Sequence, residues 1–155
     1  MMELSELINS DSVVATLKVG SKKQALQELA QIAENVTGIS SRDIFGTVLQ
    51  RERLGSTGVG QGIAIPHGKL DELDRLFAIF ARLDTPISFD AMDDQPVDLI
   101  FMLLAPESAG ADHLKALARI SRTLRDPSVT QKLRDSASAA EIYSILTQPA
   151  TSHAA

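Results

Sequence analysis

Apolar residues recur at helical spacing in the first third of this chain, and they predict two helices there. The first helix has Ser21 as a candidate N-cap and stops at Gly38, where a glycine suits a helix end. The second begins at Ser40 or Ser41 and extends to the glycine-rich stretch that follows. A short helix and an extended segment precede them, at residues 4–8 and 13–17.

The middle of the chain replaces helical spacing with short apolar runs, which are typical of strands. We expect a loop over residues 55–62, because four glycines interrupt that stretch. The run 97–105 is apolar except for Asp98, a pattern typical of a strand covered on both faces. Further strands are expected at 63–65, 76–83 and 87–89, with turns at 84–86 and 92–96.

Helical spacing returns after residue 110 and completes an α/β pattern. An amphipathic helix is expected at 113–124, and the Asp126-Pro127 pair ends it. Helices on either side of a group of strands predict a single α/β domain over residues 1–147, with a central mixed sheet flanked by helices on both faces. Two short helices and a flexible C-terminal tail follow, at 129–134, 139–146 and 148–155.

Composition narrows the classes of partner and compartment. The chain has a formal net charge of −5, a pI near 5.1 and no cysteine. Its acidity disfavours nucleic acid as a ligand, and the missing cysteine removes disulfides and thiolate chemistry. Residues 1–6 lack the basic start of a signal peptide, and the longest apolar run, 99–105, is too short to span a bilayer. We therefore expect a cytoplasmic protein with no membrane insertion.

The strongest candidate for chemistry is His67, which follows a short apolar run and Pro66. Proline cannot donate to a sheet ladder, so we expect it to end a strand and leave His67 at an exposed strand end. Histidine can act there as a nucleophile, as a metal ligand or as an ordinary loop residue. The chain has no H-x-H or H-E-x-x-H pattern to support a metal, and a metal hydrolase is disfavoured because one of the three histidines, His153, lies in the tail.

The glycines before His67 do not match a nucleotide-binding motif. Gly58 and Gly60 are not followed by the third glycine of G-x-G-x-x-G, and Gly68-Lys69 is followed by leucine instead of the serine or threonine of a P-loop. The expected strand also follows these glycines, whereas both phosphate motifs need it first. The acidic turn at residues 90–94 lacks the alternating pattern of a calcium loop, and no G-x-S-x-G motif is present.

Two further residues would suit a phosphoryl group on His67. His113 lies in the first turn of a predicted helix, at the end of the helix dipole that favours anions. Arg51 precedes the glycine-rich stretch, and a guanidinium can clamp phosphoryl oxygens with paired hydrogen bonds. Both also have ordinary interpretations, as a helix-start histidine and as part of a solvated charge cluster. Lys69 and Lys115 are weaker candidates that fit surface charges.

Two segments around the candidate residues carry a more specific pattern. The first contains Arg51-Glu52-Arg53, Ser56-Thr57-Gly58-Val59-Gly60 and Ala64-Ile65-Pro66-His67-Gly68, and the second contains residues 96–101, 104–107 and 113–118. Together they resemble the IIA domains of the bacterial phosphotransferase system, fructose/mannitol type. The resemblance covers most of the chain, and the run 89–98 is similar to the nitrogen-regulatory branch of that family. Sugar-type members often carry Asp-Gly where this chain has Asp94-Gln95.

The resemblance implies an α/β sandwich in which His67 is phosphorylated by a small HPr-like phosphocarrier, itself charged by an enzyme I that uses phosphoenolpyruvate. It also implies that His113 and Arg51 flank the phosphorylated ring, and it suggests Nε2 as the attacking nitrogen. No metal, nucleotide or other cofactor is then required. The chain would be a phosphoryl carrier rather than a turnover enzyme, with targets such as potassium transporters or sensor kinases.

Three functions remain open from the sequence. The first is a regulatory carrier whose partners respond to the phosphorylation of His67. The second is a sugar-transport IIA component that passes the phosphoryl group to a IIB domain. These two functions are distinguished by the protein that accepts the group from His67. The third is a binding module in which His67 is never phosphorylated. The expected oligomeric state is a monomer or a weak dimer.

Overall fold

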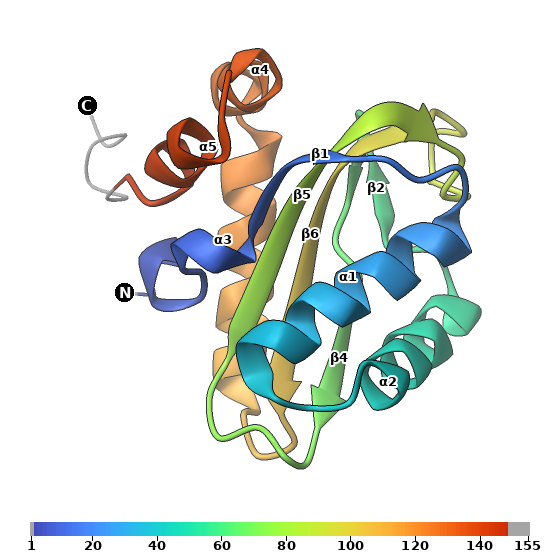
Figure 1. Ribbon diagram of the computed structural model, residues 1–155, viewed down its shortest axis with the longest axis vertical. Helices are drawn as coiled ribbons and strands as arrows, with labels where there is room; N and C mark the ends of the chain where they lie inside the picture. The colour runs from blue at the N-terminus through green and yellow to red at the C-terminus, as the bar shows by residue number, and fades with distance from the viewer. Residues whose placement is uncertain (1, 149–155) are drawn as a thin grey trace.

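A mixed β-sheet with helices on both faces forms the centre of the protein, as the computed structural model of residues 2–148 shows (Figure 1). Within these residues the strand order is β1-β5-β6-β3-β2, and β4 pairs with β6 in line with β3. This architecture confirms the predicted fold class. The strands are β1 (Val13–Leu17), β2 (Gly58–Gly60), β3 (Ile63–Ala64), β4 (His67–Leu70), β5 (Phe77–Ile87) and β6 (Val97–Pro106).

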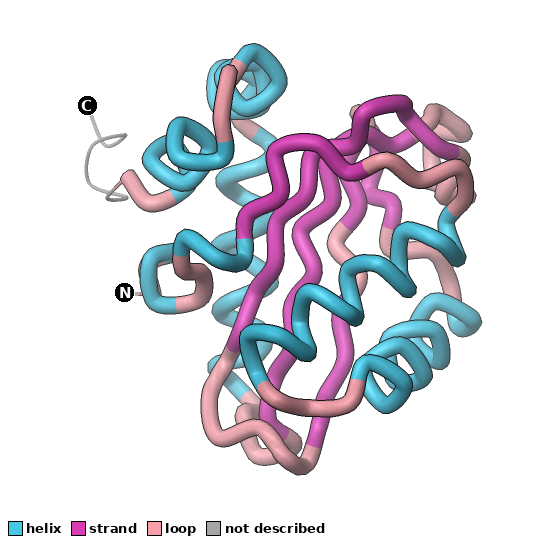
Figure 2. The backbone as a smooth tube through the Cα atoms, in the orientation of Figure 1, coloured by secondary structure: helices cyan, strands magenta, loops and turns pink. Residues whose placement is uncertain are grey.

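The helices divide into two groups, one on each face of the sheet. Figure 2 shows the strands as a layer between these groups. The helices α1 (Lys22–Thr37) and α2 (Ser41–Leu54) cover one face. The other face carries α3 (Ala111–Arg125), α4 (Pro127–Asp135), α5 (Ala139–Leu146) and two 3₁₀ turns, η1 (Leu4–Glu6) and η2 (Ser10–Ser12). The turn η1 takes the place of the short helix predicted at residues 4–8.

The interior strand β6 explains why residues 97–105 are apolar at nearly every position. Successive side chains of a strand point to opposite faces, so a strand between two helical layers needs apolar residues throughout. Ile100 and Met102 pack into the core beneath α1 and α2, whereas Phe101 and Leu103 pack into the core beneath α3 to α5. The strand pairs antiparallel with β5 and parallel with β3 and β4.

Local capping residues set most of the helix ends at the predicted places. The Ser21 side chain accepts a hydrogen bond from Gln24 N, and α1 ends at Gly38, whose φ is +79°. Ser40 caps α2 in the same way. Asp126 ends α3 and begins α4, with Pro127 at the first helical position, where its missing N–H costs nothing.

Four predictions for the strands and the segments between them were wrong in detail. Gly58–Gly60 form a strand rather than a loop, and the strand predicted at 63–65 ends at Ala64. The strand β5 continues through the turn predicted at 84–86, and residues 88–89 are not in a strand. Proline is tolerated at position 86 because the pairing of β5 with β6 skips from Arg82 to Ile87. No hydrogen bond between these two strands therefore requires an N–H at Pro86.

The described residues leave out Met1 and residues 149–155. The tail predicted at 148–155 lies outside the described residues except for Gln148, and His153 lies outside them as well. Between residues 2 and 148 no helix combines the length and the apolar character needed to cross a bilayer.

Candidate functional site

His67 begins β4 rather than following a strand, because Pro66 interrupts the edge that β3 and β4 share along β6. The side chain is half-buried, whereas the sequence predicted an exposed strand end. Its Nδ1 lies 2.9 Å from Ile65 O. A carbonyl oxygen only accepts, so in the neutral ring Nδ1 carries the hydrogen and Nε2 keeps a lone pair.

The surroundings of His67 hold its ring in the neutral form. Burial lowers the pKa of His67 below its ordinary value of 6.5, and the positive charge of Arg51 lowers it further. The hydrogen bond to Ile65 and the negative charge of Glu52 act in the opposite direction but do not cancel the effect of burial. A neutral imidazole with a free Nε2 is the form that can attack an electrophile.

His113 faces this ring from the first turn of α3. The ring centroids lie 5.6 Å apart and the ring planes meet at 79°, in an edge-to-face arrangement. His113 is only 7% exposed, and burial lowers its pKa, followed by the charges of His67 and Lys69. Its Nε2 is buried and has no hydrogen-bond partner within residues 2–148. A buried polar atom of this kind is costly, so it is available to an incoming group beside His67.

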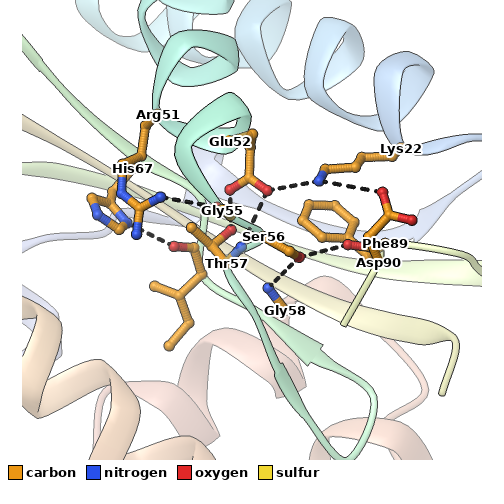
Figure 3. A network of polar contacts seen from close by, with 11 residues as sticks. Lys22, Arg51, Glu52, Gly55, Ser56, Thr57, Gly58, His67, Phe89 and Asp90 are labelled. Carbon is orange, nitrogen blue, oxygen red and sulfur yellow. Dashed lines mark hydrogen bonds and ion pairs between the residues drawn. The ribbon is translucent and has the colours of Figure 1, made fainter. Parts of the chain in front are cut away.

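Arg51 reaches the same place from the last turn of α2, and Figure 3 shows its guanidinium beside His67. Its Nη1 donates to Gly55 O at 2.9 Å. The bond fixes the side chain over the start of the glycine-rich stretch and leaves the other guanidinium hydrogens for an anion. The structure thus brings together the three residues that the sequence singled out.

A buried carboxylate beside Arg51 was missed by the sequence, which placed Glu52 in a solvated charge cluster. Glu52 is 6% exposed and accepts hydrogen bonds from Thr57 N, Thr57 Oγ and Lys22 Nζ (Figure 3). A usable signal existed, because Glu52 follows the buried Ile44 and Val48 at a spacing of four. That spacing puts all three on one face of the helix.

The remaining candidates lie elsewhere or play another part. Lys69 is exposed on β4 and affects the site through its charge, whereas Lys115 lines a groove against Glu6 and Met2. No group of three His, Asp or Glu side chains within the described part of the chain is placed to hold a metal ion.

The acidic turn at residues 90–94 fastens the β2–β3 hairpin. Asp93 accepts hydrogen bonds from Gln61 N at 2.9 Å and Gln95 N at 3.1 Å, and these bonds lower its pKa. Asp90 lies 3.8 Å from Lys22 Nζ. Asp93 therefore holds the turn of the β2–β3 hairpin, and Asp90 lies beside the Lys22 that contacts Glu52.

Known proteins resemble this chain over nearly its whole length. A family model described as "Phosphoenolpyruvate-dependent sugar phosphotransferase system, EIIA 2" matches residues 6–148. The nitrogen regulatory protein of Bradyrhizobium diazoefficiens is 58% identical over 148 residues, which cover 96% of this chain and 97% of that protein. A fructose-specific EIIA component of Haloferax volcanii is 38% identical, covering 92% of this chain and 90% of its own.

A solved structure supports the same relationship. The crystal structure of the nitrogen regulatory protein IIA-Ntr from Neisseria meningitidis matches with a TM-score of 0.88 and 38% sequence identity. The match covers 93% of this chain and 99% of that one. The likeness therefore extends over the sheet and both helical layers.

Proposed function

We propose a function from one premise: the chain belongs to the EIIA type 2 family of the phosphoenolpyruvate-dependent sugar phosphotransferase system. Its similarity to nitrogen regulatory proteins supports a regulatory role in such a system. In this proposal His67 accepts a phosphoryl group from an HPr-like phosphocarrier in the cytoplasm. The phosphorylation of His67 then controls which partner proteins the chain binds.

The contact between His67 Nδ1 and Ile65 O carries the proposal, because it leaves Nε2 as the nucleophile. The Nε2 lone pair attacks the phosphorus of a phosphohistidine on the carrier. A new N–P bond forms on His67 while the N–P bond of the carrier breaks, and the electron pair of the broken bond stays on the carrier nitrogen. The carrier ring is protonated on its other nitrogen and therefore leaves as a neutral imidazole, while Nδ1 of His67 keeps its own hydrogen, so the phosphorylated His67 ring is formed in its protonated state.

Charge stabilisation in this step falls to Arg51 and His113. Phosphoryl transfer passes through a loose transition state, so a protein contributes mainly by positioning and by placing donors against the phosphoryl oxygens. The guanidinium of Arg51 and the unpartnered Nε2 of His113 are the donors beside the ring. His113 donates from Nε2 in the tautomer that carries its hydrogen there.

The test is phosphorylation with purified components. We would incubate the protein with phosphoenolpyruvate, enzyme I and the HPr-like carrier, and then measure intact mass. The proposal predicts a gain of one acid-labile phosphoryl group that is absent in His67→Ala. No gain in the presence of a demonstrably charged carrier would instead favour a binding module that works without phosphate.

Regulation would follow from the charge that the phosphoryl group adds. A phosphohistidine brings up to two negative charges to a site that is otherwise neutral at its two rings. Partners such as potassium transporters or sensor kinases would then bind one form in preference to the other. Pull-down with phosphorylated protein and with His67→Ala tests this preference.

A sugar-specific role is the second candidate, supported by the 38% identity to a fructose-specific EIIA component. In that role phosphorylated His67 passes its group to a IIB domain. Transfer from the phosphorylated chain to a purified fructose-type IIB domain, followed by labelling of sugar, would favour this function over the regulatory one.

A further inference from the structure

We infer that Glu52 is a positioning residue for His67, acting through Thr57 and Ile65 without touching the phosphoryl group. The inference rests on the proposed function, in which His67 is the nucleophile. The residues form a continuous series of hydrogen bonds from α2 to the imidazole ring, part of which Figure 3 shows. The bonds at Glu52 and Thr57 are buried, and the bond to His67 is part-buried.

The first step fixes the backbone of Thr57. Glu52 and Thr57 are 6% and 5% exposed, so their bonds form away from water. The Glu52 carboxylate accepts hydrogen bonds from Thr57 N, at 3.2 Å, and from Thr57 Oγ. Lys22 Nζ lies 2.9 Å from Glu52 Oε1. Three donors on one buried carboxylate hold it strongly, because leaving any of them unpaired would cost free energy.

The second step links the Thr57 backbone to the Ile65 backbone. Ile65 N donates to Thr57 O at 3.0 Å. The register of the sheet pairs Ala64 and His67 with β6 but does not include Ile65, because the chain is interrupted at Pro66. The bond to Thr57 therefore fixes the Ile65 backbone on its amide side, and Leu103 N, which donates to Pro66 O at 2.9 Å, fixes the chain just beyond the Ile65 carbonyl.

The third step sets the ring. Ile65 O accepts from His67 Nδ1 at 2.9 Å, so the position of the Ile65 carbonyl decides whether Nδ1 carries the hydrogen. A shift of that carbonyl would let the ring rotate or adopt the other tautomer, which places the hydrogen on Nε2 and removes the nucleophile. Glu52 thus acts on the reacting atom through two intermediate residues.

The experiment measures the ring and the reaction separately. Ring ¹⁵N NMR reports the tautomer of His67 in the unphosphorylated protein, and single-turnover kinetics with charged carrier report transfer. We would compare Glu52→Gln and Thr57→Val with Thr57→Ser, which keeps the hydroxyl. Glu34→Gln is the matched control, since Glu34 accepts a bond from Ser41 N at 2.7 Å on the same side of the sheet but lies outside the series.

We expect Glu52→Gln and Thr57→Val to lower the population of the Nδ1–H tautomer and to slow transfer at saturating carrier by about 10- to 100-fold. The KM for the carrier should stay unchanged, because Glu52 and Thr57 are too buried to touch a partner. Thr57→Ser and Glu34→Gln should keep the wild-type ring shifts and rate.

Wild-type ring shifts in both folded variants would overturn the inference, whatever the transfer rates. Circular dichroism checks that the variants fold.

If both variants fail to fold, the ring shifts of Lys22→Met provide the test. The Lys22 side chain is 20% exposed, and the substitution removes one donor from the Glu52 carboxylate. Unchanged ring shifts in Lys22→Met would then overturn the inference. Lack of phosphorylation of the wild-type chain would refute the proposed function alone, because the ring shifts need no phosphoryl donor.

Discussion

The rings of His67 and His113 meet edge to face at a centroid distance of 5.6 Å, although 46 positions in the sequence separate the two residues. Two imidazolium ions at this distance would repel each other in a partly buried site. The arrangement therefore favours neutral rings, and it gives one ring a nucleophilic nitrogen while the other retains an unpartnered one.

Both histidines should titrate below pH 6.5, because burial lowers the pKa of each. The unfolded chain takes up these protons near pH 6.5, whereas the folded chain takes them up only at lower pH. Their contribution to stability is therefore fully present above pH 6.5 and declines as the pH falls toward the folded-state pKa values. NMR titration of the rings checks the direction, and a midpoint at or above 6.5 for either ring would contradict it.

His67→Ala should abolish phosphorylation and leave the fold intact. The side chain is half-buried at the start of a strand, so we expect the free energy of unfolding to change by about 1 kcal/mol or less. Intact mass measures the first effect and urea denaturation the second. An unfolded variant would show that the ring also supports the core.

Arg51→Ala should slow single-turnover transfer by about 10- to 1000-fold, because it removes a charged donor from the transition state. The transfer rate of Arg51→Lys should lie between those of Arg51→Ala and wild type, since lysine keeps the positive charge but lacks the planar guanidinium. The neighbouring Arg53 is exposed, and Arg53→Ala serves as the matched control at saturating carrier. Equal rates for Arg51→Ala and wild type would remove Arg51 from the site.

Arg82 should be a stability residue. Its guanidinium donates to Ala15 O at 2.8 Å, Leu133 O at 3.0 Å and Ser136 O at 2.6 Å, and so ties the end of α4 to the sheet. Arg82→Met should lower the free energy of unfolding by about 2–4 kcal/mol, since several carbonyls lose a charged donor. Urea denaturation measures the loss. The exposed Arg125 provides the comparison, and a similar loss in Arg125→Met would rule out this explanation.

Gly68 should tolerate no side chain while Thr47 is present. A Cβ at position 68 would lie 2.8 Å from Thr47 Cγ2, because α2 packs closely on β4 there. Gly68→Ala should therefore destabilise the protein by about 1–3 kcal/mol. Thr47→Ser removes the methyl group, so the double variant should recover most of the loss in thermal or urea unfolding. Equal stability of Gly68→Ala and wild type would show that Thr47 moves aside without a cost in free energy.

Elements with local signals could be predicted from the sequence. Ser21 and Gly38 mark the ends of α1 through bonds to residues within four positions, and β6 is recognisable because apolar side chains must face both layers. The strand β2 has no such signal. Gly58 fits beneath Ala91 because it lacks a side chain, and Met92 N donates to its carbonyl from far along the chain.

The candidate site was predicted unevenly for a similar reason. His67, His113 and Arg51 stood out through their residue types and the family resemblance, and the topology brings them together. Glu52 did not, because a run of charges usually lies in solvent and only the fold supplies Lys22 and Thr57 as its partners. The sequence could have predicted that Glu52 lies on the buried face of α2, but not which residues its carboxylate contacts there.

The last turn of α2 also limits how the length of this helix can vary. Arg51 and Glu52 are neighbours, yet one reaches the half-buried ring and the other the interior, since each residue of an α-helix turns the chain by about 100°. Insertion or deletion of a single residue within α2 would rotate this pair away from both destinations at once. Changes of length are therefore expected in the loops of this protein, while the number of residues from Ser41 to Glu52 stays fixed.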